Sequence, residues 1–193
     1  MGTVVGLRTN EGVIVAADTA TSSGTVVQSD DVEKLWEIHP TAILGAASSS
    51  GSMRSFARAI RLETDRYETD RGERMDMNAL STLVASKLRS RPYANNEVLL
   101  GGVDDDAHVF TVSREDGVLE DTCVSIGSGM EVVYGILDDE APASRSTPEA
   151  RKVACRAIEA AIERDTDTGG SIQLAEISTA GIAIRCYESA DDL

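Results

Sequence analysis

Residues 3–17, TVVGLRTNEGVIVAA, decide the fold of this chain. Thr3–Arg8 is rich in β-branched and apolar residues, and Val13–Ala17 is a second apolar run. Between them, Thr9-Asn10-Glu11-Gly12 has the residue types of a tight turn. Two apolar runs joined by such a turn predict a β-hairpin. The chain therefore begins with two antiparallel strands.

Outward from this hairpin the hydrophobic pattern changes twice. Short apolar runs predict strands at Val26–Val27, Leu35–Ile38 and Ala42–Ala47, and helical spacing then predicts two amphipathic helices, over Met53–Tyr67 and Met77–Leu88. Thr147 is the predicted N-cap of a later helix, with Pro148 at its first position. The remaining predictions are strands at Val98–Val103, His108–Val112, Leu119–Ile126, Ile172–Ile177 and Gly181–Cys186, and helices at Glu131–Leu137 and Thr147–Arg164.

Strand runs are separated from helix runs, which favours an α+β fold over strict β–α alternation. Two antiparallel sheets packed face to face, with helices on both outer faces, would bury all of these segments. The 193 residues show no repeat or linker and fit one domain, residues 1–193.

The composition excludes several classes of function. A formal charge of −15 repels phosphate backbones, so we expect no nucleic-acid partner. Only three of the 18 basic residues are lysines, and an acidic, lysine-poor chain is typical of proteins that work at high salt; an ordinary acidic protein is the alternative. The absence of a membrane-length apolar run and of a signal-peptide pattern predicts a cytoplasmic protein. No cluster of His, Cys and carboxylates suggests a metal, and no cofactor is expected.

A series of short motifs makes the chain resemble proteasome β subunits, most of all archaeal ones, which are N-terminal-nucleophile hydrolases. Each motif is weak alone, but together they follow the family order at near-family spacing over almost the whole chain. They are Gly2–Leu7, Gly12–Asp18, Lys34–Pro40, Leu99–Asp104, Gly127-Ser128-Gly129, Tyr134–Leu137 and Arg164–Gly170. The resemblance implies a four-layer α-β-β-α sandwich.

It also implies a site. In this family a mature N-terminal threonine attacks the peptide carbonyl, and its own α-amino group accepts the proton. A buried lysine beside it, held charged by a carboxylate, corresponds to Lys34 with Asp18. The polar group around the N-terminus corresponds to Ser128, Asp165 and Thr168, where Thr168 replaces the family's usual serine. The oxyanion-binding backbone N–H corresponds to Gly45, and the residues near the specificity pocket are Thr21, Val32, Ile43 and Ala47.

Taken singly, these residues also have ordinary explanations. Asp18 at a strand end is typical of a turn or cap, Ser128 between two glycines is typical of an N-cap, and Asp165 could merely end a helix. Lys34 is harder to explain in this way, because it precedes an apolar strand in a chain that otherwise uses arginine. The spacing of the whole set favours the family interpretation.

The start of the chain departs from the family pattern. Counting back from Gly6 and Asp18 without a gap places Gly2 at the nucleophile position, which would make the subunit inactive. A one-residue gap instead makes Thr3 the nucleophile, exposed by removal of Met1 and Gly2, although such a gap flips side chains to the other strand face. Three explanations stay open: activity through Thr3, a natural non-catalytic ring member, or a chain whose nucleophile was replaced.

The resemblance therefore implies one of two functions. The first is a threonine-type endopeptidase that degrades unfolded polypeptides, with a preference for apolar residues before the cut. The second is a non-catalytic structural or regulatory ring subunit. Either would work in a homo- or hetero-oligomeric β ring, with proteasome α subunits and an ATP-dependent unfoldase as partners.

Overall fold

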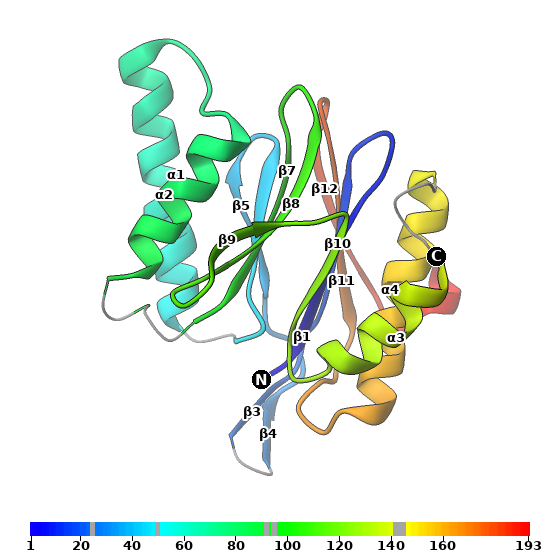
Figure 1. Cartoon of the computed structure of the whole chain (residues 1–193). Helices are drawn as coiled ribbons and strands as arrows, with labels where there is room; N and C mark the ends of the chain where they lie inside the picture. Colours follow the sequence, from blue (N-terminus) through cyan, green and yellow to red (C-terminus); the bar gives the residue numbers. More distant parts are fainter. Residues whose placement is uncertain (24–25, 49–50, 91–92, 94–95, 141–145) are drawn as a thin grey trace.

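The chain folds into four layers, helices–sheet–sheet–helices, in a computed structural model that describes residues 1–193 except 24–25, 49–50, 91–92, 94–95 and 141–145 (Figure 1). All strand pairs are antiparallel. The predicted α+β fold and four-layer sandwich are confirmed.

One five-stranded sheet has the order β10-β1-β2-β11-β12 and holds the predicted hairpin at its centre. Every residue of β2 is buried, and β1 is buried except for Arg8 at its end, because a second layer covers each face of this sheet. Its strands are β1 Thr3–Arg8, β2 Val13–Asp18, β10 Cys123–Gly127, β11 Ile172–Ser178 and β12 Gly181–Tyr187.

The other five-stranded sheet has the order β5-β6-β7-β8-β9. Its strands are β5 Leu35–His39, β6 Ala42–Gly45, β7 Val98–Val103, β8 Ala107–Ser113 and β9 Gly117–Glu120. An apolar cluster that includes Val4, Val15, Ile43, Leu99 and Ile126 fills the space between the two sheets. The first residues of β1 therefore lie at one edge of the central core.

Two helix pairs cover the outer faces of the sandwich (Figure 1). Phe56, Ile60 and Leu80 pack the first pair onto the β5–β9 sheet, and Val133, Ala157 and Ile158 pack the second pair onto the other sheet. The first pair is α1 Gly51–Arg71 and α2 Met77–Leu88; the second is α3 Met130–Glu140 and α4 Thr147–Arg164. A short 3₁₀ helix, Ala190–Asp192, follows β12.

The structure corrects two sequence predictions. The predicted single strand Leu119–Ile126 is two strands, because the chain leaves β9 and enters β10 in the other sheet; Thr122 N donates to the Asp121 carboxylate at 2.6 Å in the break. The N-cap of α4 is Ser146 rather than Thr147, since the Ser146 N–H donates to Glu149 at 3.0 Å.

A small third sheet stands apart from the sandwich. It consists only of β3 Thr21–Ser23 and β4 Val26–Ser29, and it projects beside the start of the chain (Figure 1). The predicted strand at Val26–Val27 belongs to this hairpin.

Candidate active site

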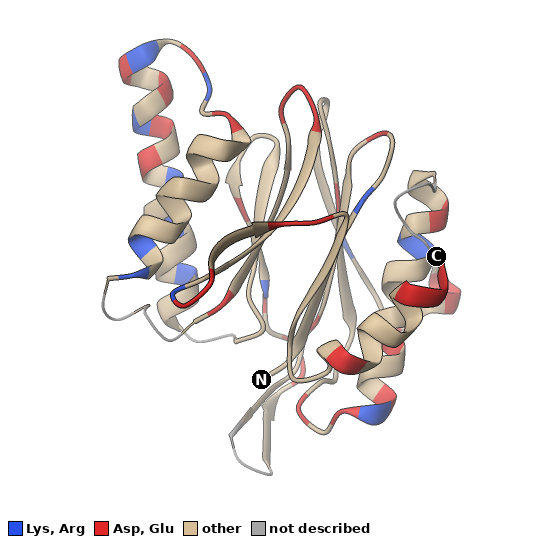
Figure 2. Ribbon diagram, in the orientation of Figure 1, with Lys and Arg blue, Asp and Glu red and all other residues tan. Residues whose placement is uncertain are grey.

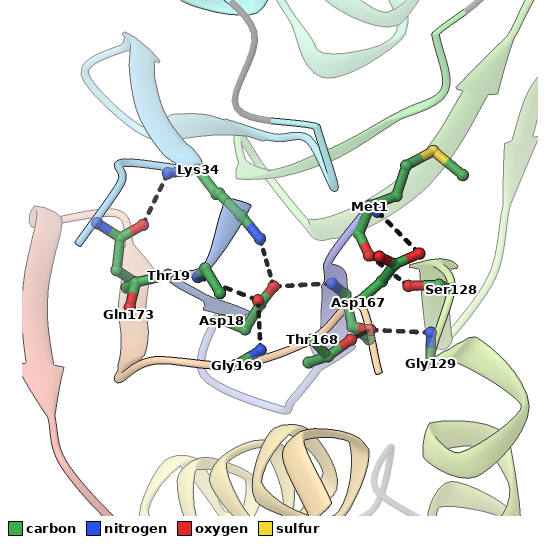
Figure 3. Close-up of polar contacts among 12 residues, drawn as sticks. Met1, Asp18, Thr19, Lys34, Ser128, Gly129, Asp167, Thr168, Gly169 and Gln173 are labelled. Atoms are coloured by element: carbon green, nitrogen blue, oxygen red, sulfur yellow. Dashed lines mark hydrogen bonds and ion pairs between the residues drawn. The ribbon is translucent and has the colours of Figure 1, made fainter. Parts of the chain in front are cut away.

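A buried ion pair lies at the end of the sandwich where the chain begins. Lys34 Nζ donates to Asp18 Oδ1 at 2.6 Å, and both side chains are 0% exposed (Figure 3). Asp18 ends β2, and Lys34 directly precedes β5, so the pair joins the two sheets. The predicted buried ammonium beside an aspartate is therefore present, within reach of the first residues.

The Asp18 carboxylate accepts three backbone N–H groups besides the ammonium. Its Oδ1 also accepts from Thr3 N at 2.8 Å, and its Oδ2 accepts from Ala20 N at 3.2 Å. Gly169 N donates to Oδ2 as well, at 2.9 Å (Figure 3). Four donors therefore satisfy both oxygens of this buried carboxylate. Asp18 thereby fixes β1, the end of β2 and the loop before β11 against one another.

Both the backbone N–H and the side-chain ammonium of Lys34 are hydrogen-bonded. Its backbone N–H donates to Gln173 Oε1 of β11 at 2.8 Å, while its ammonium contacts Asp18. Burial lowers the pKa of Lys34 from its usual 10.5, and the neighbouring Asp18 charge opposes that shift. The carboxylate partner makes a charged lysine tolerable at this depth.

The Thr3 hydroxyl is buried in a second polar cluster, on the other side of the β1 backbone. Thr3 is 0% exposed, and its Oγ1 lies 2.7 Å from Thr168 Oγ1 and accepts from Gly129 N at 3.0 Å. Thr168 Oγ1 in turn donates to Asp165 Oδ2 at 2.5 Å. Because a hydroxyl carries one proton, Thr3 must donate its own proton to Thr168.

Asp165 ties this cluster to the turn before α3. Its Oδ2 accepts from Ser128 Oγ at 2.6 Å as well as from Thr168. Ser128 Oγ also contacts the Met1 carbonyl (Figure 3). Hydrogen bonds thus connect Thr3 with Asp18 and Lys34 through its backbone N–H, and with Thr168, Asp165 and Ser128 through its hydroxyl.

The residue that faces Lys34 is Gly2, not Thr3. A Cβ built on Gly2 would lie 2.0 Å from Lys34 Nζ and 2.1 Å from Asp18 Oδ1. Successive residues of an extended chain point to opposite faces, so Thr3 points away from the ammonium. No hydrogen bond joins Thr3 Oγ1 to Lys34 Nζ within the part of the chain that the structure describes. This geometry matches the alignment without a gap, in which Gly2 occupies the nucleophile position.

Gly45 is not brought to this site. It lies in β6, opposite Leu35 on one side and Leu99 on the other. Ala46 N donates to Lys34 O, so Ala46 points its N–H towards the β5 side. Backbone N–H groups of successive residues in a strand point to opposite sides, so the Gly45 N–H points towards β7, inside the sheet. The residue of this segment that contacts the chain start is Ala47, whose carbonyl accepts from Gly2 N at 2.9 Å.

The four predicted pocket residues lie in different elements, and no hydrogen bond within the described part of the chain joins them to one another. Ile43 is 0% exposed in the core between the sheets, and Ala47 is buried beside Gly2. Thr21 lies in β3, paired with Ser29, and Val32 N donates to Thr19 O in the chain that leads to Lys34. Ile43 therefore has no surface to offer a substrate in this subunit.

Sequence reasoning missed several residues that hold the site. The backbone N–H groups of Gly129 and Gly169 donate to Thr3 and Asp18, and the sequence predictions gave neither glycine a role. Gln173 gave a usable signal, because an amide in the otherwise apolar stretch Ile172–Ala175 needs a buried partner.

Over the described ranges, no three His, Cys, Asp or Glu side chains converge so that they could hold a metal ion. None of the described helices is long and apolar enough to cross a bilayer.

Comparisons with known proteins agree with the resemblance. A family model described as proteasome subunit matches residues 1–177. The chain is 44% identical to the proteasome subunit beta of Halorhabdus utahensis, over 99% of this chain and 81% of the relative. It is also 41% identical to two subunits of Haloarcula marismortui: beta 1, over 96% of this chain and 78% of the relative, and beta 2, over 98% and 84%. These relatives come from haloarchaea, which confirms the halophilic interpretation of the composition.

Proposed function

The chain belongs to the proteasome subunit family as a β-type subunit, and from this premise we propose that it is a ring member that supplies no nucleophile of its own. One observation carries the proposal. The backbone position that faces Lys34 and Asp18 is Gly2, which has no hydroxyl. An ammonium beside this position has no reacting oxygen to act on.

The polar residues then have a structural role. The Lys34–Asp18 pair joins the two sheets, and the cluster of Thr3, Thr168 and Asp165 anchors β1 to the loop before β11. Buried polar networks whose members are all satisfied rigidify a fold. In a subunit of this kind, these polar residues would stabilise the fold of the ring member and would take no part in a reaction.

The proposal includes partners. We expect the subunit to assemble in a β ring beside a catalytically competent β-type subunit, flanked by α subunits and served by an ATP-dependent unfoldase that delivers unfolded polypeptides, in the cytoplasm. Haloarcula marismortui has two relatives of this chain, named beta 1 and beta 2. The presence of two β subunits in one organism supports a division between active and silent members.

A second candidate is a threonine-type endopeptidase that uses Thr3. One observation favours it: Thr3 N lies 2.8 Å from Asp18, and its hydroxyl is already in the Thr168–Asp165 cluster. Removal of Met1 and Gly2 would give Thr3 a free α-amine, whose ordinary pKa of about 7.7–8.0 suits a general base. The direction of the Thr3 side chain, away from Lys34, disfavours this candidate.

Thr3→Val separates the two functions. For a silent subunit, we expect the peptidase activity of particles that contain it to stay unchanged. The free energy of unfolding should still fall by about 1–3 kcal/mol, because the Gly129 N–H and the Thr168 hydroxyl lose a buried partner. Fluorogenic peptide turnover and chemical denaturation measure the two effects.

Thr82→Val is the matched control, since Thr82 is exposed on α2; it should leave both quantities unchanged. Loss of inhibitor-sensitive turnover in Thr3→Val, with assembly intact, would contradict the silent role and support the second candidate.

A further inference from the structure

A hollow lies at the end of the sandwich opposite to the chain start, and the proposed function does not use it. Figure 1 shows the β5–β6 and β7–β8 turns at this end, far from the N-terminus. The hollow has a volume of about 570 Å³, within the range of about 300–1,000 Å³ that small-molecule sites have. Its lining includes His39, Thr41, Arg74, Asp104, Asp105 and Asp106. We call it the distal hollow.

His39 contributes a buried hydrogen-bond donor to the distal hollow. The residue is 8% exposed, and its Nδ1 accepts from Thr41 N at 3.4 Å. A neutral imidazole whose Nδ1 accepts carries its proton on Nε2. Nε2 is buried and has no hydrogen-bond partner among the residues that the structure describes. Since buried N–H groups are almost always paired in proteins, this donor suits a ligand that brings an acceptor.

The imidazole of His39 is neutral near pH 7. Burial lowers the pKa of His39 from its usual 6.5, and the Arg74 charge lowers it further, against the opposing charges of Glu68 and Asp65. The ring therefore presents one N–H at Nε2 rather than a positive charge. The positive charge that lines the distal hollow comes from Arg74 instead.

Arg74 is available to a ligand. Its Nε lies 3.7 Å from Glu68 Oε1, an ion pair that is longer than a hydrogen bond. A guanidinium has five N–H donors, so the Glu68 contact leaves donors free. An imidazole N–H and a guanidinium in one hollow suit a carboxylate, which accepts several hydrogen bonds and carries the opposite charge.

The β7–β8 turn adds negative charge to the same hollow, and Figure 2 shows this turn in red. Asp104 already has partners, because it accepts from Met77 N at 2.8 Å and lies 3.1 Å from His108 Nε2. Asp105 and Asp106 are exposed, and neither carboxylate makes a hydrogen bond or ion pair with a described residue. These two carboxylates suit an ammonium group.

The charges also indicate which ligands do not fit. A metal ion lacks a set of ligands, since no three suitable side chains converge among the described residues. A dianion such as phosphate would be repelled by the free carboxylates of Asp105 and Asp106. A molecule with one carboxylate and one ammonium matches both kinds of lining.

We propose that the distal hollow binds a small zwitterion of the amino-acid type, whose carboxylate accepts from His39 Nε2 and Arg74 and whose ammonium contacts Asp105 and Asp106. Free amino acids and short peptides share this chemistry. Peptide-bond hydrolysis releases such ends, so a catalytic neighbour in the same particles is one source of the ligand. Only that source rests on the proposed function; the binding site itself does not.

A titration of the full ¹⁵N-labelled chain with triglycine tests the proposal. In a molar KCl buffer at pH 7, the imidazole signals of His39 should shift in a saturable way, because Nε2 gains an acceptor. Triglycinamide lacks the carboxylate and should bind about 10-fold more weakly, since it loses the buried hydrogen bond. N-acetyl-triglycine lacks the ammonium and should bind about 5-fold more weakly, since it loses only exposed ion pairs. Glycine compares the free amino acid with the peptide as the source.

A double substitution, Asp105→Asn with Asp106→Asn, locates the ammonium. Triglycine should bind this variant about 5-fold more weakly, whereas N-acetyl-triglycine should bind it as it binds the unmodified chain, because the contact that the substitution removes is then absent already. Asp138→Asn with Asp139→Asn is the matched control, since these adjacent aspartates are also exposed but lie on α3. It should bind triglycine like the unmodified chain.

His39→Phe tests the carboxylate end and keeps an aromatic ring in place. It removes the unpaired donor, so the variant should fold, and triglycine should bind it about 10-fold more weakly, read from the backbone signals of Asp105 and Asp106. The absence of a saturable shift with both glycine and triglycine would overturn the proposal. Equal binding of triglycine and both capped forms, or equal loss in the α3 control, would do the same. The proposed function would survive any of these results, because it depends on Gly2.

Discussion

Asp18→Asn will lower the free energy of unfolding by about 3–5 kcal/mol, because it leaves the fully buried Lys34 ammonium without a counter-charge. The asparagine amide also offers one acceptor oxygen where the aspartate offers two, to donors from Lys34, Thr3, Gly169 and Ala20. Chemical denaturation in molar KCl measures the loss. In a chain of this size it corresponds to a fall in Tm of about 6–20 °C.

Asp70→Asn is the matched control for this loss. Asp70 also pairs with a cation, Arg66, at 3.5 Å, but both side chains are more than half exposed. Exposed pairs of this kind contribute less than about 1 kcal/mol. If the two variants lost equal stability, the Asp18 pair would not be the central anchor that its burial indicates.

Threonine at position 2 will make the subunit a target for threonine-directed electrophilic inhibitors, whereas valine at that position will not. A side chain at residue 2 points at Lys34 and Asp18, so in a chain that starts at this residue the hydroxyl and the α-amine would both adjoin the buried ammonium. A positioned base contributes about 10²–10⁴-fold to such a reaction. We therefore expect Gly2→Thr to be labelled at least about 100-fold faster than Gly2→Val, as measured by intact mass over time.

The valine variant controls for packing. Both branched side chains force Lys34 Nζ to move, since a Cβ at residue 2 would lie 2.0 Å from it. Adding Lys34→Ala to Gly2→Thr should abolish the labelling. Equal labelling rates in Gly2→Thr and Gly2→Val would show that residue 2 is not the position where this site performs chemistry.

Much of the fold could be predicted from local patterns. The TNEG turn between two apolar runs fixed the β1–β2 hairpin, and the helical spacing of Phe56 and Ile60 fixed α1. The break between β9 and β10 was not predicted, because apolar residues occur on both sides of it and the two strands are distinguished by the sheet that each one joins. Local hydrophobicity does not encode which sheet a strand joins.

Some residues of the site could also be predicted from the sequence, and others could not. The resemblance to proteasome β subunits implied the pairing of Lys34 with Asp18, and the structure places the two side chains 2.6 Å apart. Gln173 bonds to Lys34 across 139 positions of sequence, a contact that only the packing of β11 beside β2 creates. The placement of Gly45 depends on which side of β6 its N–H points, and the motif around it does not reveal this pairing.

The most direct test is the intact mass of the natural subunit, isolated from assembled particles after saturating treatment with an electrophilic inhibitor of N-terminal threonine. Because Gly2 faces Lys34 and the Thr3 hydroxyl donates to Thr168 instead, we predict an unmodified mass while a catalytic neighbour in the same particles is fully labelled. An inhibitor adduct on a chain that begins at Thr3 would contradict the account.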